Sequence, residues 1–422
     1  RKHAAMLRRG VAVAGGVNTI VAPQLHISFN KAGMLAPDGR CKTFSGTANG
    51  YVRGEGAGML FLKKLGAAQA DGDHIYGVIR GSAENHGGRA NSLTSPNSLS
   101  QAQVMTKAWQ RAGIDMNTAT YLEAHGTGTP LGDPVEINGI KAAFTAQGGA
   151  APCAIASVKT NIGHLELAAG VAGVIKVLLQ FRHQRIAPSL HCDTVNPLID
   201  LSHTRFHIPR QAQAWETPPG ADGRPLPRRA GVSSFGFGGV NAHVVLEEYQ
   251  APPAAAVALN APVLVPLSAR TPAALRRYVQ SLLDWITVEP GVSLPALAYT
   301  LQVGRDPFDE RLGFAVRSLA ELERGLRDFL DSGGQAGAFV QGQVSHNREA
   351  LGSYVDDDDL QATMALWLDK GKVAQFLGMW VKGVHFDWNR LYRHLAADRR
   401  PRRISAPTYP FERERLWPAP AT

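Results

Sequence analysis

The sequence predicts a layered α/β fold followed by a smaller α/β unit. Short apolar segments typical of buried strands alternate with helical patterns over the first 250 residues, which favours sheets covered by helices. An Ala- and Pro-rich stretch at 251–262 then has the composition of a linker. Strand and helix patterns resume beyond it over a shorter length, so the chain divides into a large unit and a small one.

The composition excludes several classes of protein. A chain of 422 residues with 44% hydrophobic and 19% charged residues is globular and can bury a large core. The net charge of +9 comes partly from an arginine cluster at 393–403, but no basic groove with interleaved aromatic residues accompanies it, so nucleic acid is not expected as a partner. Cys41, Cys153 and Cys192 are too few and too scattered for a disulfide framework or a metal site, and they predict a reducing cytoplasm.

Apolar runs and their boundaries define the elements of the large unit. One helix is expected to begin at an N-cap, Ser100, and to end at Gly113, and another covers Pro134–Phe144. The most apolar segment, Leu165–Phe181, carries three polar residues and is short for a bilayer, which predicts a buried core helix opened by His164 and no membrane contact. Strands are expected at Val11–Gly15, Ala57–Leu65, Ile75–Ser82, Tyr121–Ala124, Ala154–Ser157, Ala230–Phe235 and Val244–Glu247.

The small unit shows the same alternation. The acidic run Asp356–Asp359 has no ligand-spaced partners and is interpreted as a solvated loop. From Phe386 to Trp417 there is little periodicity but there are many large side chains, which indicates a tail that packs along a neighbour. Strands are expected at Val263–Ser268 and Leu312–Val316, and helices at Pro272–Trp285, Leu294–Leu301 and Leu319–Leu330.

Three glycine-rich segments place histidines and a lysine at the ends of apolar segments. They are Glu123–Pro134, in which His125 directly follows a strand, Lys159–His164, and Gly236–His243 between two strands. A glycine-rich turn alone is weak evidence for function. Three such turns that can converge on one pocket are more specific evidence for an active site than any one of them.

These motifs resemble the β-ketoacyl synthase (ketosynthase) family of polyketide synthases, within the thiolase-like condensing enzymes. Segments 39–44, 50–56 and 81–94 also look like this family. The resemblance implies a thiolase-like layered α/β/α/β/α fold that lacks its N-terminal part, over residues 1–250. It also implies acyl transfer with carbon–carbon bond formation between two thioesters.

Such a condensation needs a nucleophile for one acyl group and neutral donors for the enolate oxygen formed when the other loses CO2. By resemblance, His125 and His164 are the catalytic histidines, and a helix dipole at His164 is expected to keep its imidazole neutral. Lys159 resembles the family's supporting lysine, with Glu136 as its expected partner.

The resemblance assigns the remaining site residues as well. The hydroxyls of Thr127 and Thr129 match those that hydrogen-bond a phosphopantetheine arm. In the last turn, the backbone N–H of Phe237 completes an oxyanion hole and its ring gates the acyl pocket. Phe235 and Gly238 flank that gate, and Asn241 supports the turn.

No cysteine in the chain has the serine-rich flank of the family's nucleophile. Cys41 follows a turn, Cys153 precedes a strand and Cys192 lies in a loop, so each is interpreted as structural. The chain resembles the larger, C-terminal part of a ketosynthase, and the N-terminal part with the nucleophilic cysteine is expected as a partner.

The rest of the chain indicates the kind of synthase. Residues 251–390 resemble the flanking α/β subdomain of modular polyketide synthases, and 391–422 the linker that wraps back on the ketosynthase. No acyltransferase lies between them, which implies that an acyltransferase acting in trans loads the acyl carrier protein. A homodimer is expected, and no cofactor beyond the carrier's phosphopantetheine.

Three hypotheses remain. The first is an elongating ketosynthase that condenses an acyl thioester with malonyl-acyl carrier protein. The second is a non-elongating ketosynthase that only transfers acyl groups, although such enzymes often lose the first histidine. The third is an inactive, truncated scaffold.

Overall fold

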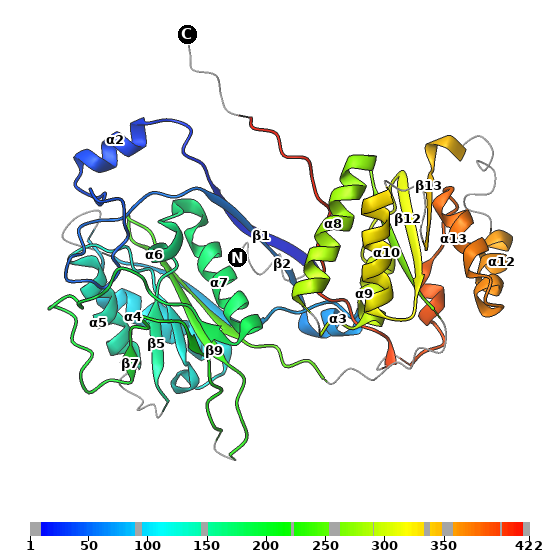
Figure 1. Ribbon diagram of the computed structural model, residues 1–422. Coiled ribbons are helices and arrows are strands. Elements are labelled where there is room, and N and C mark those ends of the chain that lie inside the picture. The colour runs from blue at the N-terminus through cyan, green and yellow to red at the C-terminus, as the bar shows by residue number, and fades with distance from the viewer. Residues whose placement is uncertain are drawn as a thin grey trace, which may run out of the picture. The chain divides into compact units, whose positions relative to one another are not determined.

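The chain forms two compact units, each described by itself. The structure, a computed structural model, describes residues 10–88, 95–144, 151–220, 223–252, 262–289, 291–332, 338–347, 358–396 and 399–416. Unit 1 comprises Arg1–Leu65 and Ile75–Gln250, and unit 2 comprises Gly66–His74 and Ala251–Thr422 (Figure 1). The layered α/β part and the smaller α/β part expected from the sequence are both present.

A six-stranded mixed sheet is the centre of unit 1. Its order is β3-β10-β9-β4-β5-β7, with the first three strands antiparallel and the last four parallel. The strand β4 is short, and it ends two residues before His125. The bounds are β3 Val78–His86, β4 Tyr121–Glu123, β5 Cys153–Ala156, β7 Phe206–His207, β9 Arg229–Phe235 and β10 Val240–Glu247.

The helix α7 (Ala169–His183) forms a layer between this sheet and an antiparallel ribbon of β1 (Val11–Asn18) and β2 (Gly56–Lys63). Glycines permit the close approach on both sides. A Cβ on Gly58 of the ribbon would lie 2.9 Å from Ile175, and a Cβ on Gly173 would lie 3.1 Å from the side chain of Glu123. The apolar helix predicted from the sequence is therefore a core layer of unit 1.

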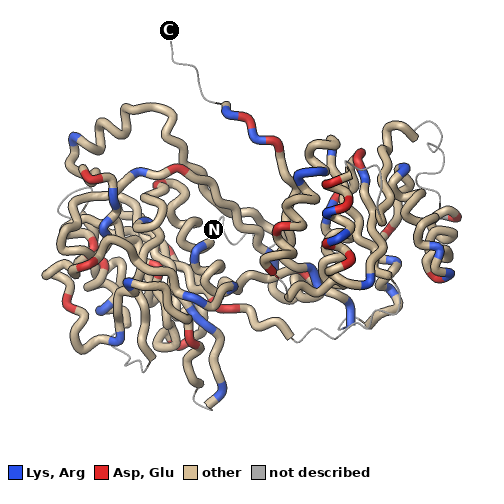
Figure 2. Tube along the Cα trace, in the orientation of Figure 1, with Lys and Arg blue, Asp and Glu red and all other residues tan. Residues whose placement is uncertain are grey.

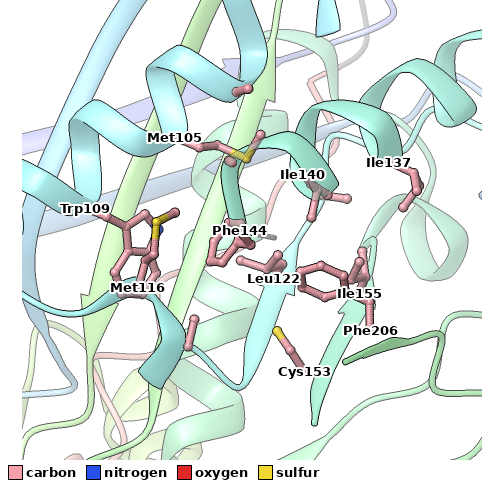
Figure 3. Close-up of a cluster of buried hydrophobic side chains, with 14 of the residues drawn as sticks. Met105, Trp109, Met116, Leu122, Ile137, Ile140, Phe144, Cys153, Ile155 and Phe206 are labelled. Carbon is pink, nitrogen blue, oxygen red and sulfur yellow. The ribbon is translucent and has the colours of Figure 1, made fainter. Parts of the chain in front are cut away.

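Two helices cover the opposite face of the sheet. They are α4 (Ser98–Ala112) and α5 (Gly132–Phe144), which pack against each other, and α4 also packs over β3 and β10. Their apolar side chains meet those of β4 and β5 in the cluster shown in Figure 3, around Met105, Trp109 and Phe144. Alternation along β4 sends Leu122 to this cluster and Tyr121 to the α7 side.

Two predicted helix starts are wrong. The N-cap of α4 is Asn97, whose side chain accepts hydrogen bonds from the N–H groups of Leu99 and Ser100, so Ser100 lies inside the helix. His164 does not open the apolar helix, because a 3-10 turn at Glu166–Ala168 precedes the start of α7. The cause is local, since Glu166 adopts a φ of 44° that interrupts helical geometry.

The remaining elements of unit 1 are short. Two of them, α2 and α6, bring side chains to the candidate site described below. Their bounds are α2 Gln24–Lys31, η1 Met116–Thr118, α6 Lys159–Ile162, β6 Arg185–Ile186 and β8 Gln213–Ala214. The helix α3 (Leu65–Ala70) begins at the end of unit 1 and continues into unit 2.

Unit 2 is a three-stranded antiparallel sheet between two groups of helices. The sheet order is β11-β12-β13. One face packs on α8, α9 and α10, and the other on α12 and α13 (Figure 1). The bounds are β11 Val263–Ala269, α8 Pro272–Val288, α9 Leu294–Val303, β12 Glu310–Val316, α10 Leu319–Ser332, β13 Phe339–Gln343, η4 Ser345–Asn347, α12 Asp358–Asp369, α13 Val373–Val381 and η5 Trp388–Tyr392.

The acidic run is not wholly a loop. Asp356 and Asp357 lie outside the described residues, but Asp358 and Asp359 begin the helix α12. None of the helices in the described part of the chain combines the length and apolar character that a bilayer crossing requires.

The tail packs within unit 2. Ile404, Ala406 and Tyr409 join the core formed with α8 and α9. Arg403 binds the segment from α3, pairing with Asp73 at 2.6 Å and donating to backbone oxygens there. Beyond these contacts, acidic and basic residues alternate toward the C-terminus (Figure 2).

His243 of β10 leads to a prediction about stability. It is 1% exposed, its Nε2 accepts from the indole N–H of Trp109, and its other ring nitrogen lies 3.0 Å from the hydroxyl of Ser233. Burial lowers its pKa to about 3. The folded state therefore holds this imidazole neutral where the unfolded chain, with a pKa near its usual ~6.5, takes up a proton.

The stabilising contribution of neutral His243 is complete above pH ~6.5 and is lost as the pH falls through the unfolded pKa. From pH 7.5 to 5.5, the free energy of unfolding should fall by about 1.4 kcal/mol more in the wild type than in His243→Gln. Urea unfolding at the two pH values measures this difference. His394→Gln, at an exposed position, should follow the wild type. Parallel pH dependence in the wild type and His243→Gln would contradict the prediction.

Candidate active site

His125 and His164 meet in one site. Their ring centroids are 5.5 Å apart and the rings are nearly perpendicular. His125 lies just beyond the end of β4, and His164 is held by a bridge to Arg53, donating its N–H to the oxygen of Val52. Both residues are only partly buried, so each retains a surface that a substrate could reach.

Backbone donors select the tautomer of each imidazole. The N–H of Phe235 donates to Nδ1 of His125 at 3.3 Å, and the N–H of Glu166 donates to Nδ1 of His164 at 2.9 Å. A neutral imidazole that accepts at Nδ1 carries its proton on Nε2. Both histidines are therefore prepared to act as Nε2–H donors.

The surroundings keep both rings uncharged. Burial is the main cause of a pKa for His125 well below its usual value, and the positive charge of Lys159 adds to it. Burial and then Lys159 lower the pKa of His164 to about 2. The helix dipole expected to act on His164 is not the cause, because α7 begins five residues later.

Lys159 lies at the start of α6 and is 4% exposed. Its ammonium donates a hydrogen bond to the backbone oxygen of His125. Burial lowers its pKa, and the charge of Glu123 opposes this more than that of any other neighbouring group. Lys159 thus joins the two histidine segments.

Glu136 is not the direct partner of Lys159 that the sequence led us to expect. Its two carboxylate oxygens accept from the backbone N–H groups of His125 and Gly126, both at 2.7 Å. Burial raises its pKa to about 7, although these bonds and Lys159 favour the anion. Glu136 therefore acts on the turn that carries His125 and reaches Lys159 only through the electrostatic field.

Asp133, one turn earlier on α5, fixes the next part of the same loop. Its carboxylate accepts from the N–H groups of Phe44 and Gly128. Gly128 has a φ of 78°, and a Cβ there would lie 2.9 Å from the backbone of Lys42. Only glycine fits that position without strain. The motif Gly-Thr-Gly-Thr thus owes its glycines to close packing of the loop.

The two threonines lie at the edge of this loop. Their hydroxyls are 3.5 Å apart, and that of Thr129 accepts from the N–H of Gly132. Both side chains are partly exposed. The hydroxyl of Thr127 lies two residues beyond His125, and the long contact with Thr129 holds it only weakly.

The glycine turn after β9 brings only some of its predicted residues to the histidines. The Phe235 ring is 5.7 Å from that of His125. Phe237 is 66% exposed, with its ring 6.4 Å from Phe29 of α2. Gly238 is partly buried, with a φ of 93°. Asn241 pairs with Phe235 across the sheet, and its amide donates to the side chain of Asn85 on β3.

Sequence reasoning missed the residues that support His164. Arg53 forms a two-pronged ion pair with Glu166, at 2.6 and 3.0 Å, and its guanidinium lies over the ring of Phe29. The Tyr51 ring is 5.1 Å from that of His164. The segment 50–56 attracted notice as a motif, but an ion pair spanning 113 positions leaves no periodic signal in a sequence.

The three cysteines are all free and buried. Burial raises the pKa of the Cys41 and Cys192 thiols and that of Cys153 to about 12. Cys41 is closest to the histidine segments, and its sulfur accepts from the N–H of Val52. Within the described ranges, no group of three His, Cys, Asp or Glu side chains is arranged to hold a metal ion.

Family models match most of the chain in three parts. They are the β-ketoacyl synthase N-terminal domain over residues 3–68, its C-terminal domain over 76–193, and a RhiE-like, KS-MAT linker domain over 266–333. Among curated relatives, polyketide synthases PksN and PksL of Bacillus subtilis are 50% and 44% identical over 96% and 97% of this chain. The chain spans only 8% and 9% of their lengths.

Solved structures support the same assignment. The ketosynthase from module 6 of the bacillaene synthase of Bacillus subtilis is 39% identical, with a TM-score of 0.89 over 99% of this chain and 71% of that one. The oxazolomycin ketosynthase domain OzmH KS7 of Streptomyces albus is 37% identical, with a TM-score of 0.84 over 99% and 67%. The thiolase-like fold is thereby confirmed, and the chain belongs to the β-ketoacyl synthase family as a ketosynthase of the polyketide synthase type.

Proposed function

We propose that this chain carries the histidine side of a ketosynthase that elongates a polyketide by decarboxylative Claisen condensation. The substrates would be an acyl thioester and malonyl carried on the phosphopantetheine of acyl carrier protein. One observation carries the proposal: two neutral imidazoles, each set as an Nε2–H donor, meet at one site. Charge that develops on an oxygen between them would be stabilised without a prior proton transfer.

The chemistry uses these donors at one step. Loss of CO2 from the malonyl thioester breaks a carbon–carbon bond, and the electron pair left behind forms an enolate with negative charge on the thioester oxygen. The Nε2–H groups of His125 and His164 would donate to that oxygen. The enolate carbon then attacks the acyl carbon of the second thioester, and the tetrahedral intermediate collapses with release of the thiolate that carried the acyl group.

The other site residues would prepare the two donors and admit the substrate. Lys159 would hold the peptide of His125, and its charge would add to the effect of burial in keeping both imidazoles neutral. Thr127 and Thr129 would bind the pantetheine arm at the rim. Phe237, with Phe235 and Gly238 in the same turn, would form the oxyanion hole and the acyl gate.

We propose that the attacking thiol comes from an N-terminal part of the ketosynthase outside this chain. An apolar groove of about 610 Å3 lies beside the segment that carries His164, lined by residues of α6, α7 and β2. The ribbon of β1 and β2 also exposes Val13, Met59 and Phe61, the last at 80%. Apolar surfaces of this kind suit a covering segment, and a cysteine on it would lie close to His164.

The same proposal extends to the other parts of the chain. Residues 1–250 would be the ketosynthase part, 251–390 a flanking subdomain, and 391–422 a linker that wraps back on the ketosynthase. Since no acyltransferase lies between residues 251–390 and 391–422, an acyltransferase acting in trans would load the carrier protein. A homodimer in a reducing cytoplasm completes the proposal.

Removal of one imidazole donor tests the decarboxylation step. His164→Ala, in a ketosynthase that joins this chain to its cysteine-bearing part, should lower CO2 release from malonyl-acyl carrier protein by about 10²–10³-fold, because one oxyanion donor is lost. Release of labelled CO2 measures the rate. His394→Ala in the exposed tail is the matched control.

The outcomes separate the three hypotheses. Undiminished CO2 release in His164→Ala would reject its role as a donor. A wild-type enzyme that transfers acyl groups but releases no CO2 would be the non-elongating ketosynthase, against which the retained His125 argues. A wild-type enzyme that shows neither acylation nor CO2 release would support the third hypothesis, an inactive scaffold.

The cysteines of this chain give a second test. Incubation with an acyl thioester at pH 7.5 should leave Cys41, Cys153 and Cys192 unacylated, because burial raises the pKa of each thiol. Peptide mass spectrometry detects the adducts, and iodoacetamide in urea should label all three as a control. A stable acyl adduct on any of them would show that the chain contains its own nucleophile.

A further inference from the structure

Glu123, the last residue of β4, lies at the meeting point of three elements. Its side chain is 2% exposed. One carboxylate oxygen accepts from the N–H of Val158 at 2.5 Å, and the other accepts from the hydroxyl of Tyr121 at 2.6 Å. The second oxygen also pairs with the ammonium of Lys176 on α7 at 2.9 Å.

Each of these contacts bears on a different part of the active site. Val158 directly precedes Lys159, so its N–H fixes the start of the lysine turn against β4. Glu123 itself is two residues before His125, so the same carboxylate fixes the strand that carries that histidine. Lys176 anchors both to the helix α7, which Gly173 allows to approach the side chain of Glu123 closely.

Lys159 also depends on Glu123 for its charge. The ammonium is buried and donates to the oxygen of His125. Among the groups around it, Glu123 does most to favour the protonated form, ahead of Glu136, Cys41 and Asp133. Glu136 is less available as a counter-charge for Lys159, because both of its oxygens already bind backbone N–H groups.

We propose that Glu123 is a positioning residue, whose buried carboxylate fixes the Val158–Lys159 turn against the strand of His125 and balances the charge of Lys159. This inference deepens the proposed function, since it explains how the Lys159–His125 contact is held. Burial is the main reason that His125 and His164 have lowered pKa values, and the charge of a protonated Lys159 adds to it.

The rival interpretation is that Glu123 only balances Lys176. The groups that face Glu123 are Tyr121 on its own strand, Lys176 on α7 and Lys159 on α6. Removing Glu123 alone leaves Lys176 buried without a counter-charge, which is strongly destabilising in itself. A test must therefore remove both partners of that pair as well as each alone.

Three variants of this chain separate the interpretations: Glu123→Gln, Lys176→Met, and the two combined. The readout is the pKa of Lys159, followed by NMR of the 13Cε resonance in lysine-labelled protein and assigned with Lys159→Arg. We expect Glu123→Gln and the double variant to lower this pKa by about one pH unit or more, because a nearby opposite charge is lost. Lys176→Met should leave it within about half a unit of the wild type.

The double variant keeps the test decisive if Glu123→Gln fails to fold, since replacing a buried ion pair by neutral groups is often tolerated. A Lys159 pKa in the double variant equal to that of the wild type would overturn the proposal. A lowered pKa would support it.

A second readout uses the assembled ketosynthase. In the double variant, kcat for CO2 release should fall about tenfold with KM for malonyl-acyl carrier protein unchanged, because the donors are displaced but the binding rim is not. An unchanged kcat would also count against Glu123. The NMR result does not depend on turnover. A wild-type enzyme that releases no CO2 would contradict the proposed function, and the Lys159 pKa would still test the role of Glu123.

Discussion

Two backbone N–H groups determine what this site can do. They come from Phe235 and Glu166, and each occupies the Nδ1 of a histidine. An imidazole bound in this way can donate from Nε2 but has no free nitrogen with which to accept a proton while neutral. The site is therefore built to stabilise negative charge, and a role for either histidine as a general base would require the loss of one of these bonds.

Burial and the charge of Lys159 favour the neutral imidazoles, and buried carboxylates hold the backbone around them. Lys159 disfavours a second positive charge on either imidazole, and Glu136 and Asp133 hold the loop after His125 through backbone N–H groups rather than by pairing with cations. Glu123 holds both the strand before His125 and the turn before Lys159. Because these groups are buried, solvent screens their interactions weakly, and a change in one is felt by the others.

Local sequence patterns allowed much of the fold and of the site to be predicted. The features that depend on long-range contacts could not be predicted in this way. The strand before His125, the apolar core helix and the order of the motifs follow from apolar runs and glycine turns. The start of α7 could not be placed, because a left-handed φ at Glu166 separates His164 from that helix. The partner of Lys159 was wrong for a different reason. Glu136 was expected as that partner, but in the folded chain its oxygens bind backbone amides of the His125 turn.

The electrostatics of the site also bear on the source of the sulfur. A thiol becomes reactive where positive charge and donors favour the thiolate, and the space between the two Nε2–H groups and near Lys159 offers such an environment. The three cysteines of this chain lie where burial favours the neutral thiol instead. Even Cys41, which feels the charge of Lys159, has a raised pKa because burial outweighs that charge. Activating Cys41 would require exposing it, and exposure would disrupt the loop whose contacts hold Val52 against His164. The same packing that prepares the histidines therefore argues against a nucleophile from within these residues.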